Sequence, residues 1–321
     1  MDSPLITVRV ARKATEALDI CSFDLVDPAG ADLPAFTPGA HIDVHIGDAV
    51  RQYSLCNSSL EPQRYRIAVL REPQSRGGSR ALHDDLAVGH TLRISAPRNH
   101  FPLAPDAAHS LLLAGGIGIT PLLSMMAELA GRQASYALHY CTRSHARTAF
   151  RQWLQSPPHA DRVVFHCDED PRQRLDIGRL LEAAPPGTHL YVCGPAGFLE
   201  HVLDAARARG WPPQCLHYEY FSAPQQAADA AANRPFQVQI ASTGARYDVG
   251  ADESVAHALH RHGIEIPLSC EQGICGTCMT GVLAGQPDHR DACLTPDEQA
   301  RNDRFTPCCS RSASPVLVLD L

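Results

Sequence analysis

The sequence predicts a multidomain protein with an antiparallel β-barrel, an α/β domain built on a parallel sheet, and a small α+β domain. Short alternating runs of apolar and polar residues fill positions 1–104, and strand-like and helix-like segments then alternate over 105–223. A cysteine-rich segment, 235–321, closes the chain. A chain of 321 residues with 44% hydrophobic residues is long enough to build two or three separate cores.

Composition excludes several classes of function. The net charge is −7, and no basic run occurs, so nucleic acid is not an expected partner. No apolar run approaches the length of a bilayer span, and the N-terminal residues MDSPLITVRVARKATEALDI lack the apolar core of a signal peptide. The twelve cysteines are spread over a long chain without a secretory signal, which argues against a disulfide framework. We therefore expect a soluble, cytoplasmic protein with no membrane partner.

Three segments of the first domain read as strands of the predicted barrel. HIDVHI, RYRIAVL and TLRIS alternate apolar and polar residues, and Gly, Pro and Asp turns separate them. Within this domain RQYSL, residues 51–55, follows a strand. Arg51 can pair with a phosphate, Tyr53 offers an aromatic face, and Ser54 can bind a phosphate or the edge of a flavin ring. Taken alone, RQYSL is also compatible with any exposed strand.

The segment SRGGSRALHD follows about twenty residues later. Gly77 and Gly78 can expose backbone N–H groups, and Ser79 and Ala81 open a predicted helix. This position predicts an anion site.

The second domain alternates strands and helices. LLLAGG, SYALHYCT, RVVFHCD and HLYVCG read as buried strands, and PLLSMMAELA reads as a helix after the first of them. This alternation is typical of a parallel α/β sheet.

Two glycine-containing turns of this domain suggest a dinucleotide site. LLLAGGIGITP runs from strand through glycine turn to helix, which presents backbone N–H groups to a pyrophosphate. It differs from the G-x-G-x-x-G pattern because Pro121 replaces the third glycine. The second turn, Cys193-Gly194-Pro195, follows a later strand. The alternative for Cys193 is a plain buried thiol.

The 224–234 segment is rich in Ala, Gln and Pro and is predicted to be a linker. In the domain after it, PFQVQIASTGARYDV predicts a hairpin, ADESVAHALHRHG a capped helix, and SPVLVLDL a closing strand.

CEQGICGTC has the C-x4-C-x2-C spacing of plant-type [2Fe-2S] proteins, with Cys270, Cys275 and Cys278 as three ligands. Structural zinc is the rival, but zinc sites commonly pair two C-x2-C knuckles and only one is present.

A fourth ligand must come from Cys293, Cys308 or Cys309. Adjacent residues in an extended segment point to opposite sides, so Cys308 and Cys309 are not expected to face one cluster together. The residues alone do not choose between them.

The whole chain, in this order, resembles the phthalate dioxygenase reductase and vanillate demethylase reductase family. The motifs PGAHIDV, RQYSL and GGS, then GGIGITP and CGP, then the cysteine loop carry this resemblance. It implies a flavin barrel at 1–104, a nicotinamide domain at 105–223, a linker at 224–234 and a β-grasp, plant-type ferredoxin domain at 235–321. It also implies FMN rather than FAD.

The resemblance also implies roles for residues. For FMN they are Arg51, Tyr53, Ser54, Leu55, Arg76, Gly77, Gly78, Ser79 and Phe221, with Tyr220 as the alternative to Phe221. For the nicotinamide nucleotide they are Gly116, Gly118, Thr120, Pro121, Cys193, Gly194, Pro195, Arg143 and Ser144. Ser54, Thr120 and Cys193 are implied near the transferred hydride. Cys308 is implied as the last cluster ligand, which leaves Cys309 as a core neighbour.

The implied activity is that of an oxygenase reductase in aromatic catabolism. NADH would reduce FMN, and the [2Fe-2S] cluster would deliver single electrons to the terminal component, a Rieske-type oxygenase. The sequence CTRSHAR has Arg143, Ser144 and Arg147 but no acid where a ribose 2′-OH is usually held, which favours a 2′-phosphate. Family resemblance favours NADH, and we expect NADH and a monomer. The rivals are a stand-alone electron-transfer or sensor module, and a flavohaemoglobin-like oxygenase for which no residues remain.

Overall fold

The computed structural model describes residues 5–47, 49–73, 77–221 and 233–321. The chain divides into two compact units, with the boundary after Phe221. The predicted ligand Arg76 and most of the expected linker, 224–234, lie outside the described residues.

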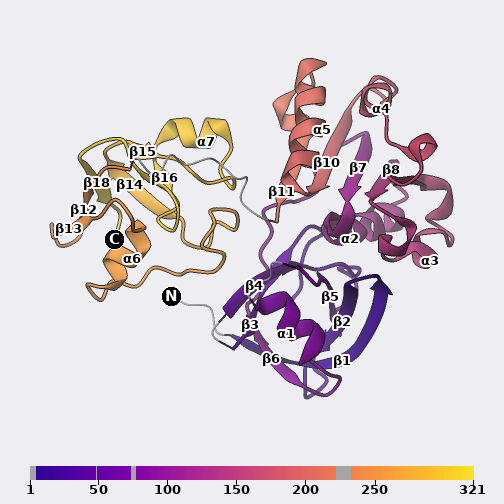
Figure 1. Ribbon diagram of the computed structural model, residues 1–321, viewed down its shortest axis with the longest axis horizontal. Coiled ribbons are helices and arrows are strands. Elements are labelled where there is room, and N and C mark those ends of the chain that lie inside the picture. Colours follow the sequence, from indigo (N-terminus) through magenta and orange to yellow (C-terminus); the bar gives the residue numbers. More distant parts are fainter. Residues whose placement is uncertain (1–4, 48, 74–76, 222–232) are drawn as a thin grey trace. The chain divides into compact units, whose positions relative to one another are not determined.

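The first unit begins with a curled antiparallel sheet in the strand order β4-β3-β6-β1-β2-β5 (Figure 1). Its two edge strands approach each other, because Leu55 and Ile67 form an antiparallel bridge. Alternating residues such as Val8, Val10 and Phe23 fill its interior. The elements are β1 (Ile6–Ala17), β2 (Ile20–Val26), β3 (His41–Ile46), β4 (Ala49–Ser54), β5 (Tyr65–Leu70), α1 (Gly78–Asp84) and β6 (Thr91–Ile94). The expected strands in HIDVHI, RYRIAVL and TLRIS are confirmed, and RQYSL follows β3 and forms most of β4.

A five-stranded parallel sheet in the order β11-β10-β7-β8-β9 completes the first unit. Its strands are β7 (His109–Gly115), β8 (Tyr136–Thr142), β9 (Val163–Cys167), β10 (Thr188–Gly194) and β11 (Leu216–Tyr220). Its helices are α2 (Ile119–Gly131), α3 (Arg151–Leu154), α4 (Ile177–Glu182) and α5 (Ala196–Ala208). Short 3-10 turns are η1 (Gly116–Gly118), η2 (His145–Arg147), η3 (Ala160–Arg162), η4 (Pro171–Gln173) and η5 (Pro213–Cys215). The expected strands and the helix in PLLSMMAELA are confirmed.

Alternate residues of β7 belong to different layers. Leu112 and Ala114 pack in a cluster with α2, while Leu111 and Leu113 pack with α4 and α5. The α2 cluster also contains Ile20, Cys56 and Ala68 of the antiparallel segment. The two sheets of the first unit therefore contribute to one shared hydrophobic cluster.

The second unit has a mixed sheet in the order β13-β12-β18-β14-β16 and a separate pair, β15 and β17. Its elements are β12 (Phe236–Ile240), β13 (Arg246–Val249), α6 (Val255–His260), β14 (Thr280–Ala284), β15 (Pro287–Asp288), α7 (Pro296–Arg301), β16 (Arg304–Phe305), β17 (Arg311–Ser312) and β18 (Val316–Leu319). The expected hairpin, helix and closing strand are confirmed. Ser254 caps α6 by accepting the His257 N–H at 3.2 Å.

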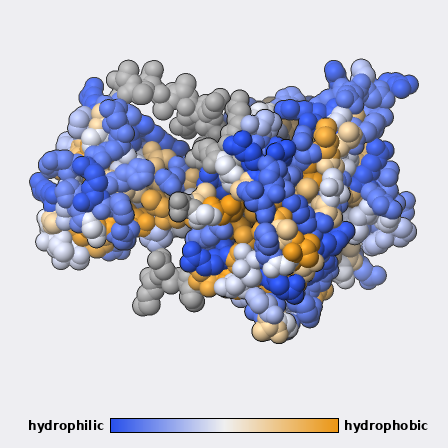
Figure 2. All heavy atoms as spheres, turned by 60° about the horizontal axis from the view of Figure 1, so that its bottom comes forward, coloured by the Kyte–Doolittle hydropathy of each residue, from blue (hydrophilic) through white to orange (hydrophobic). Residues whose placement is uncertain are grey.

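Hydrophilic side chains cover most of the face shown in Figure 2, with apolar residues scattered among them. Within the described residues, no helix has the length and apolar character needed to cross a membrane.

Candidate functional site

The carboxyl edge of the parallel sheet brings the two glycine-containing turns together. The strand order places β7 beside β10, with β8 and β9 on one side and β11 on the other. This is the switch point at which open α/β sheets bind ligands. The glycine turn Gly115–Gly118 follows β7, and Cys193-Gly194-Pro195 ends β10.

Backbone contact between the two turns requires glycine at position 118. A Cβ on Gly118 would lie 2.2 Å from the Cys193 carbonyl oxygen and 2.5 Å from the Gly194 nitrogen. A Cβ on Gly194 would lie 2.9 Å from Gly115 Cα. No side chain fits between these backbones, so the turns form one surface.

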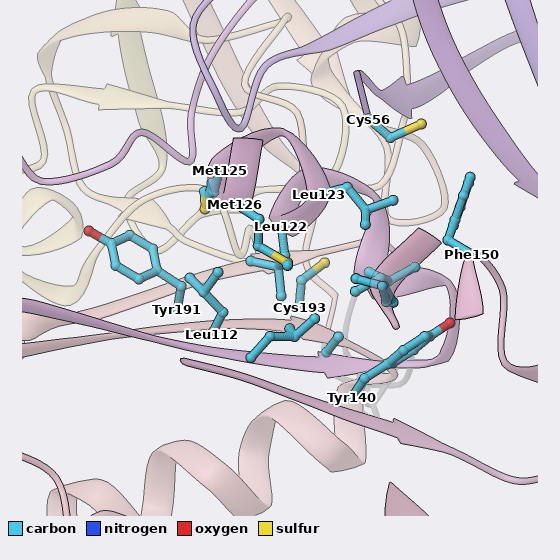
Figure 3. Close-up of a cluster of buried hydrophobic side chains, with 14 of the residues drawn as sticks. Cys56, Leu112, Leu122, Leu123, Met125, Met126, Tyr140, Phe150, Tyr191 and Cys193 are labelled. Atoms are coloured by element: carbon cyan, nitrogen blue, oxygen red, sulfur yellow. The ribbon is translucent and has the colours of Figure 1, made fainter. Parts of the chain in front are cut away.

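The other residues predicted around this surface lie beside it. Thr120 and Pro121 are buried in the first turn of α2, and the Thr120 hydroxyl donates to the Ile117 carbonyl at 3.1 Å. Figure 3 shows the Cys193 thiol among apolar side chains that include Leu122 and Leu112. Burial, with a smaller contribution from Glu219, raises the pKa of the Cys193 thiol well above its usual value. Cys193 is therefore a neutral thiol.

Ser54 at the end of β4 reaches the same edge. Its hydroxyl lies 3.5 Å from a carboxylate oxygen of Glu219. Glu219 is the ladder partner of Cys193, because β10 and β11 run parallel with these residues in register. Residues from the antiparallel segment and the parallel sheet thus meet at Glu219.

Glu219 is a functional candidate that the sequence reading missed. Removal from bulk water raises the pKa of this carboxyl to about 8, and its hydrogen bond to Ser54 opposes the rise. The available signal was an acid between two tyrosines in HYEYF. Its proximity to Ser54 depends on a contact between residues 165 positions apart.

The predicted phosphate ligands also lie together. A Cβ on Gly78 would lie 2.8 Å from Arg51 Cγ, so the start of α1 rests on the Arg51 side chain. Gly77, with φ of +100°, turns the chain into α1. The Ser79 hydroxyl accepts the Glu72 N–H at 3.2 Å.

Three other residues predicted for the flavin differ in exposure. Burial raises the pKa of the half-buried Tyr53 to about 12. The Leu55 side chain is fully buried in the core of the antiparallel sheet, so only its backbone could face a ligand. Phe221 follows β11 directly and is 38% exposed, whereas Tyr220 is half-buried against Tyr218.

The cysteine loop of the second unit takes part in two thiol pairs, one within the loop and one with Cys308. Cys270 donates a hydrogen bond to Cys275, which lowers the pKa of Cys275, and Cys308 is hydrogen-bonded to Cys278. The loop contains Gly273 and Gly276 at φ of +71° and +65°. Backbone N–H groups point at the sulfurs: Gln272 donates to Cys270 at 3.3 Å and Thr277 to Cys275 at 3.4 Å.

The expectation that Cys308 and Cys309 lie in an extended segment is wrong. Residues 307–309 form a turn, and the two thiols are hydrogen-bonded to each other. Their environments nevertheless differ. Cys308 contacts Cys278, whereas Cys309 lies 3.2 Å from the Thr306 hydroxyl and against Gly273.

The thiol pairs fit a two-iron centre. Each iron of a [2Fe-2S] cluster takes two protein ligands, and N–H groups directed at sulfur stabilise the thiolates. Within the described ranges, no group of three or more histidine, cysteine or carboxylate side chains could hold a metal ion. The two thiol pairs are compatible with this finding, because each pair contains only two cysteines.

Comparison with known proteins covers the whole chain. A family model for the 2Fe-2S iron-sulfur cluster binding domain matches residues 238–313. A model for the N-terminal domain of dimethylamine monooxygenase subunit DmmA-like proteins matches residues 93–216. A vanillate O-demethylase oxidoreductase of Pseudomonas putida is 54% identical over 319 residues, covering 99% of this chain and 100% of that protein.

Two solved structures extend the comparison. A phthalate dioxygenase reductase, described as a modular structure for electron transfer from pyridine nucleotides to [2Fe-2S], is 39% identical with a TM-score of 0.73. The match covers 99% of this chain and 98% of that one. An intact type IV self-sufficient cytochrome P450 monooxygenase is 37% identical with a TM-score of 0.91 over all of this chain, which spans 42% of that protein.

Proposed function

The chain belongs to the family of vanillate O-demethylase oxidoreductases and phthalate dioxygenase reductases, and we propose that it is the NADH-dependent reductase component of a Rieske-type aromatic oxygenase system. The observation that carries the proposal is the meeting of Ser54 with Glu219, the ladder partner of Cys193. This contact brings the predicted flavin motif, RQYSL, to the same edge of the parallel sheet as the predicted nucleotide motif that contains Cys193.

The proposed cofactors are FMN and a [2Fe-2S] cluster. When bound, FMN takes the electron pair of a hydride from NADH and releases single electrons, and the cluster carries them one at a time. The proposed domains are a flavin barrel at 1–104, a nucleotide domain at 105–223, a linker at 224–234, and a β-grasp ferredoxin at 235–321.

In the first domain, Arg51 and the backbone of Gly77–Ser79 bind the FMN phosphate, together with Arg76. Ser54 and Tyr53 orient the ring, Leu55 contributes through its backbone, and Phe221 covers the ring face. Glu219 adds a carboxyl whose pKa of about 8 leaves it protonated at neutral pH. It can therefore hold a proton beside Ser54.

In the second domain, the turn containing Gly116 and Gly118 binds the pyrophosphate, and Arg143 and Ser144 lie on the adenosine side. Thr120, Pro121, Cys193, Gly194 and Pro195 shape the nicotinamide end. Because the Cys193 thiol is neutral and buried among apolar side chains, it would support the nicotinamide pocket from within the core rather than act as a base. The third domain holds the cluster with Cys270, Cys275, Cys278 and Cys308.

Anaerobic mixing with NADH tests the proposal. The purified protein should contain FMN and [2Fe-2S], and NADH should bleach the flavin absorbance before the cluster absorbance. A stand-alone sensor or electron carrier would bind the same cofactors but remain oxidised. Absence of flavin bleaching at millimolar NADH would contradict the proposal.

Oxygenase turnover tests the proposed partner. The reductase and NADH should support O-demethylation or dioxygenation by a Rieske-type terminal component. The matched comparison is a cytochrome P450 as acceptor, since a similar chain segment occurs within a P450 protein. Turnover with the P450 as acceptor but not with the Rieske-type component would contradict the proposed Rieske-type partner.

A further inference from the structure

A fully buried carboxylate lies beside the cysteine loop of the second unit. Asp291 follows β15 and precedes α7, and its side chain has no exposed surface. A carboxylate in such a place is costly unless neighbouring groups donate hydrogen bonds to it. Its role concerns the [2Fe-2S] cluster that the loop is proposed to hold, so the inference rests on the proposed function.

Three neighbouring groups donate to this carboxylate. The Leu294 N–H donates to Oδ2 of Asp291 at 2.9 Å, and the Cys293 thiol donates to the same oxygen at 3.5 Å. The Ser310 hydroxyl donates to Oδ1 at 3.4 Å. An ionised carboxylate can accept all three, whereas a protonated acid would bring a donor of its own. The surroundings of Asp291 are therefore those of an ionised group.

No arginine or lysine forms an ion pair with Asp291 among the described residues, and Arg290 pairs instead with Asp288 at 2.7 Å. The ion-pair contact of Asp291 is with His289, whose Nδ1 lies 3.4 Å from Oδ1. This imidazole is also buried, and neither of its nitrogens has a hydrogen-bond partner within the described part of the chain. The charge of Asp291 is thus not cancelled by a guanidinium or ammonium group.

Two contacts connect Asp291 with the cysteine loop. The Ala292 N–H donates to the Gly273 carbonyl at 2.9 Å, and a Cβ on Gly273 would lie 2.9 Å from Asp291 Cα. Burial raises the pKa of the Cys293 thiol, and Asp291 and Cys275 both add to the rise. One thiol therefore lies within electrostatic reach of both Asp291 and a proposed cluster ligand.

We propose that the buried carboxylate of Asp291 lowers the reduction potential of the cluster. The reduced centre carries one more negative charge than the oxidised one, and a fixed negative charge nearby opposes that gain, most strongly where water is excluded. A lower potential makes the reduced cluster a stronger electron donor to the oxygenase. Asp291 is therefore a residue that tunes the cluster without binding it.

The variant Asp291→Asn removes the charge and keeps the shape. Its amide oxygen can still accept from the Leu294 N–H, and its NH2 group can donate to the Ser310 hydroxyl and to His289 Nδ1. Iron content and cluster absorbance should therefore match wild type. In a redox titration followed by EPR, the reduction equilibrium of the cluster should shift ~10-fold toward the reduced form, which corresponds to about 59 mV for one electron.

Two further variants separate the buried charge from other effects. Asp297→Asn removes the same charge from an exposed position in the first turn of α7, where solvent screens it, so the equilibrium should stay within about twofold of wild type. Asp291→Ser removes the buried charge with a smaller side chain. It should shift the equilibrium in the same direction as Asp291→Asn, because the effect depends on charge and not on shape.

Unchanged equilibria in Asp291→Asn and Asp291→Ser, or an equal shift in Asp297→Asn, would overturn the inference. An imidazolium at His289 would cancel the carboxylate and give the first of these results. If one neutral variant lost its iron, the other would decide. Absence of iron-sulfur absorbance from the wild-type protein would instead contradict the proposed function.

Discussion

The carboxyl edge of the parallel sheet and the cysteine loop hold their reactive groups in different ways. At the sheet edge, Gly118 lies directly against the backbone of Cys193, and neighbouring strands fix the register. In the loop, glycines at positive φ and N–H groups directed at sulfur shape a segment between α6 and β14 without regular structure. The edge is built by the fold, whereas the loop depends on the group that its thiols bind. Substitutions should therefore damage the two regions in separable ways.

The largest expected effect is removal of the whole second unit. A protein ending at Ala231 retains the predicted flavin and nucleotide residues but none of the four proposed cluster ligands. It should keep ferricyanide reduction within about twofold and lose at least ~100-fold of cytochrome c reduction, because ferricyanide takes electrons directly from flavin. Comparing the two acceptor assays checks this. Undiminished cytochrome c reduction would show that electrons do not pass through the loop.

Cys308→Ser should have the next largest effect. It removes the thiol that contacts Cys278, so most of the iron-sulfur absorbance should be lost and cytochrome c reduction should fall ~10-fold or more, while the flavin spectrum remains. Cys309→Ser is the matched control, since its thiol contacts the Thr306 hydroxyl and Gly273. If Cys309→Ser lost more iron-sulfur absorbance than Cys308→Ser, Cys309 would be the ligand instead.

Gly118→Ala tests the sheet edge without touching the loop. The new methyl group would lie 2.2 Å from the Cys193 carbonyl oxygen. The displaced turn should lower the free energy of unfolding by about 1–3 kcal/mol. It should also raise the KM for NADH ~10-fold. Cluster absorbance should not change.

Gly131→Ala, at the last residue of α2, is the control for Gly118→Ala, which precedes the first residue of that helix. Position 131 has open space within 4 Å and no positive φ, so alanine should be neutral or slightly stabilising. Denaturant unfolding and NADH kinetics of both variants measure the difference. Equal behaviour would show that the backbone contact does not hold the site.

Glu219→Gln should have the smallest effect, and the effect should depend on pH. The pKa of this carboxyl rises from 4.5 to about 8 in the fold, so the native protein holds a proton that the unfolded chain releases between these pH values. The stability of wild type should therefore fall relative to Glu219→Gln as pH rises from 4.5 to 8, and the difference should level off above 8. Because the residue is only half-buried, we expect about 1–2 kcal/mol over this range rather than the full linkage value. Melting temperatures of both FMN-bound proteins from pH 5.5 to 8.5 check the sign. A wild-type melting temperature that rises relative to that of Glu219→Gln as pH increases would contradict it.

Local pattern predicted the elements well. Alternating residues identified β3, β5 and β6, and buried runs identified β7, β8, β9 and β10. These patterns predict secondary structure because the periodicity of strands and helices can be detected over a few consecutive residues. The same local reasoning was wrong for Cys308 and Cys309, where the turn at 307–309 replaces the expected extended chain.

The sequence by itself determined the order of segments, the C-x4-C-x2-C loop, the glycine turns and the family. Each of these is a short motif whose chemistry requires particular residue types at fixed spacing. Tertiary structure alone decided which distant residues share a site. Glu219 meets Ser54 because sheet order places residues from separate segments at one edge. Such proximity depends on how whole strands pack, and no local spacing in the chain encodes it.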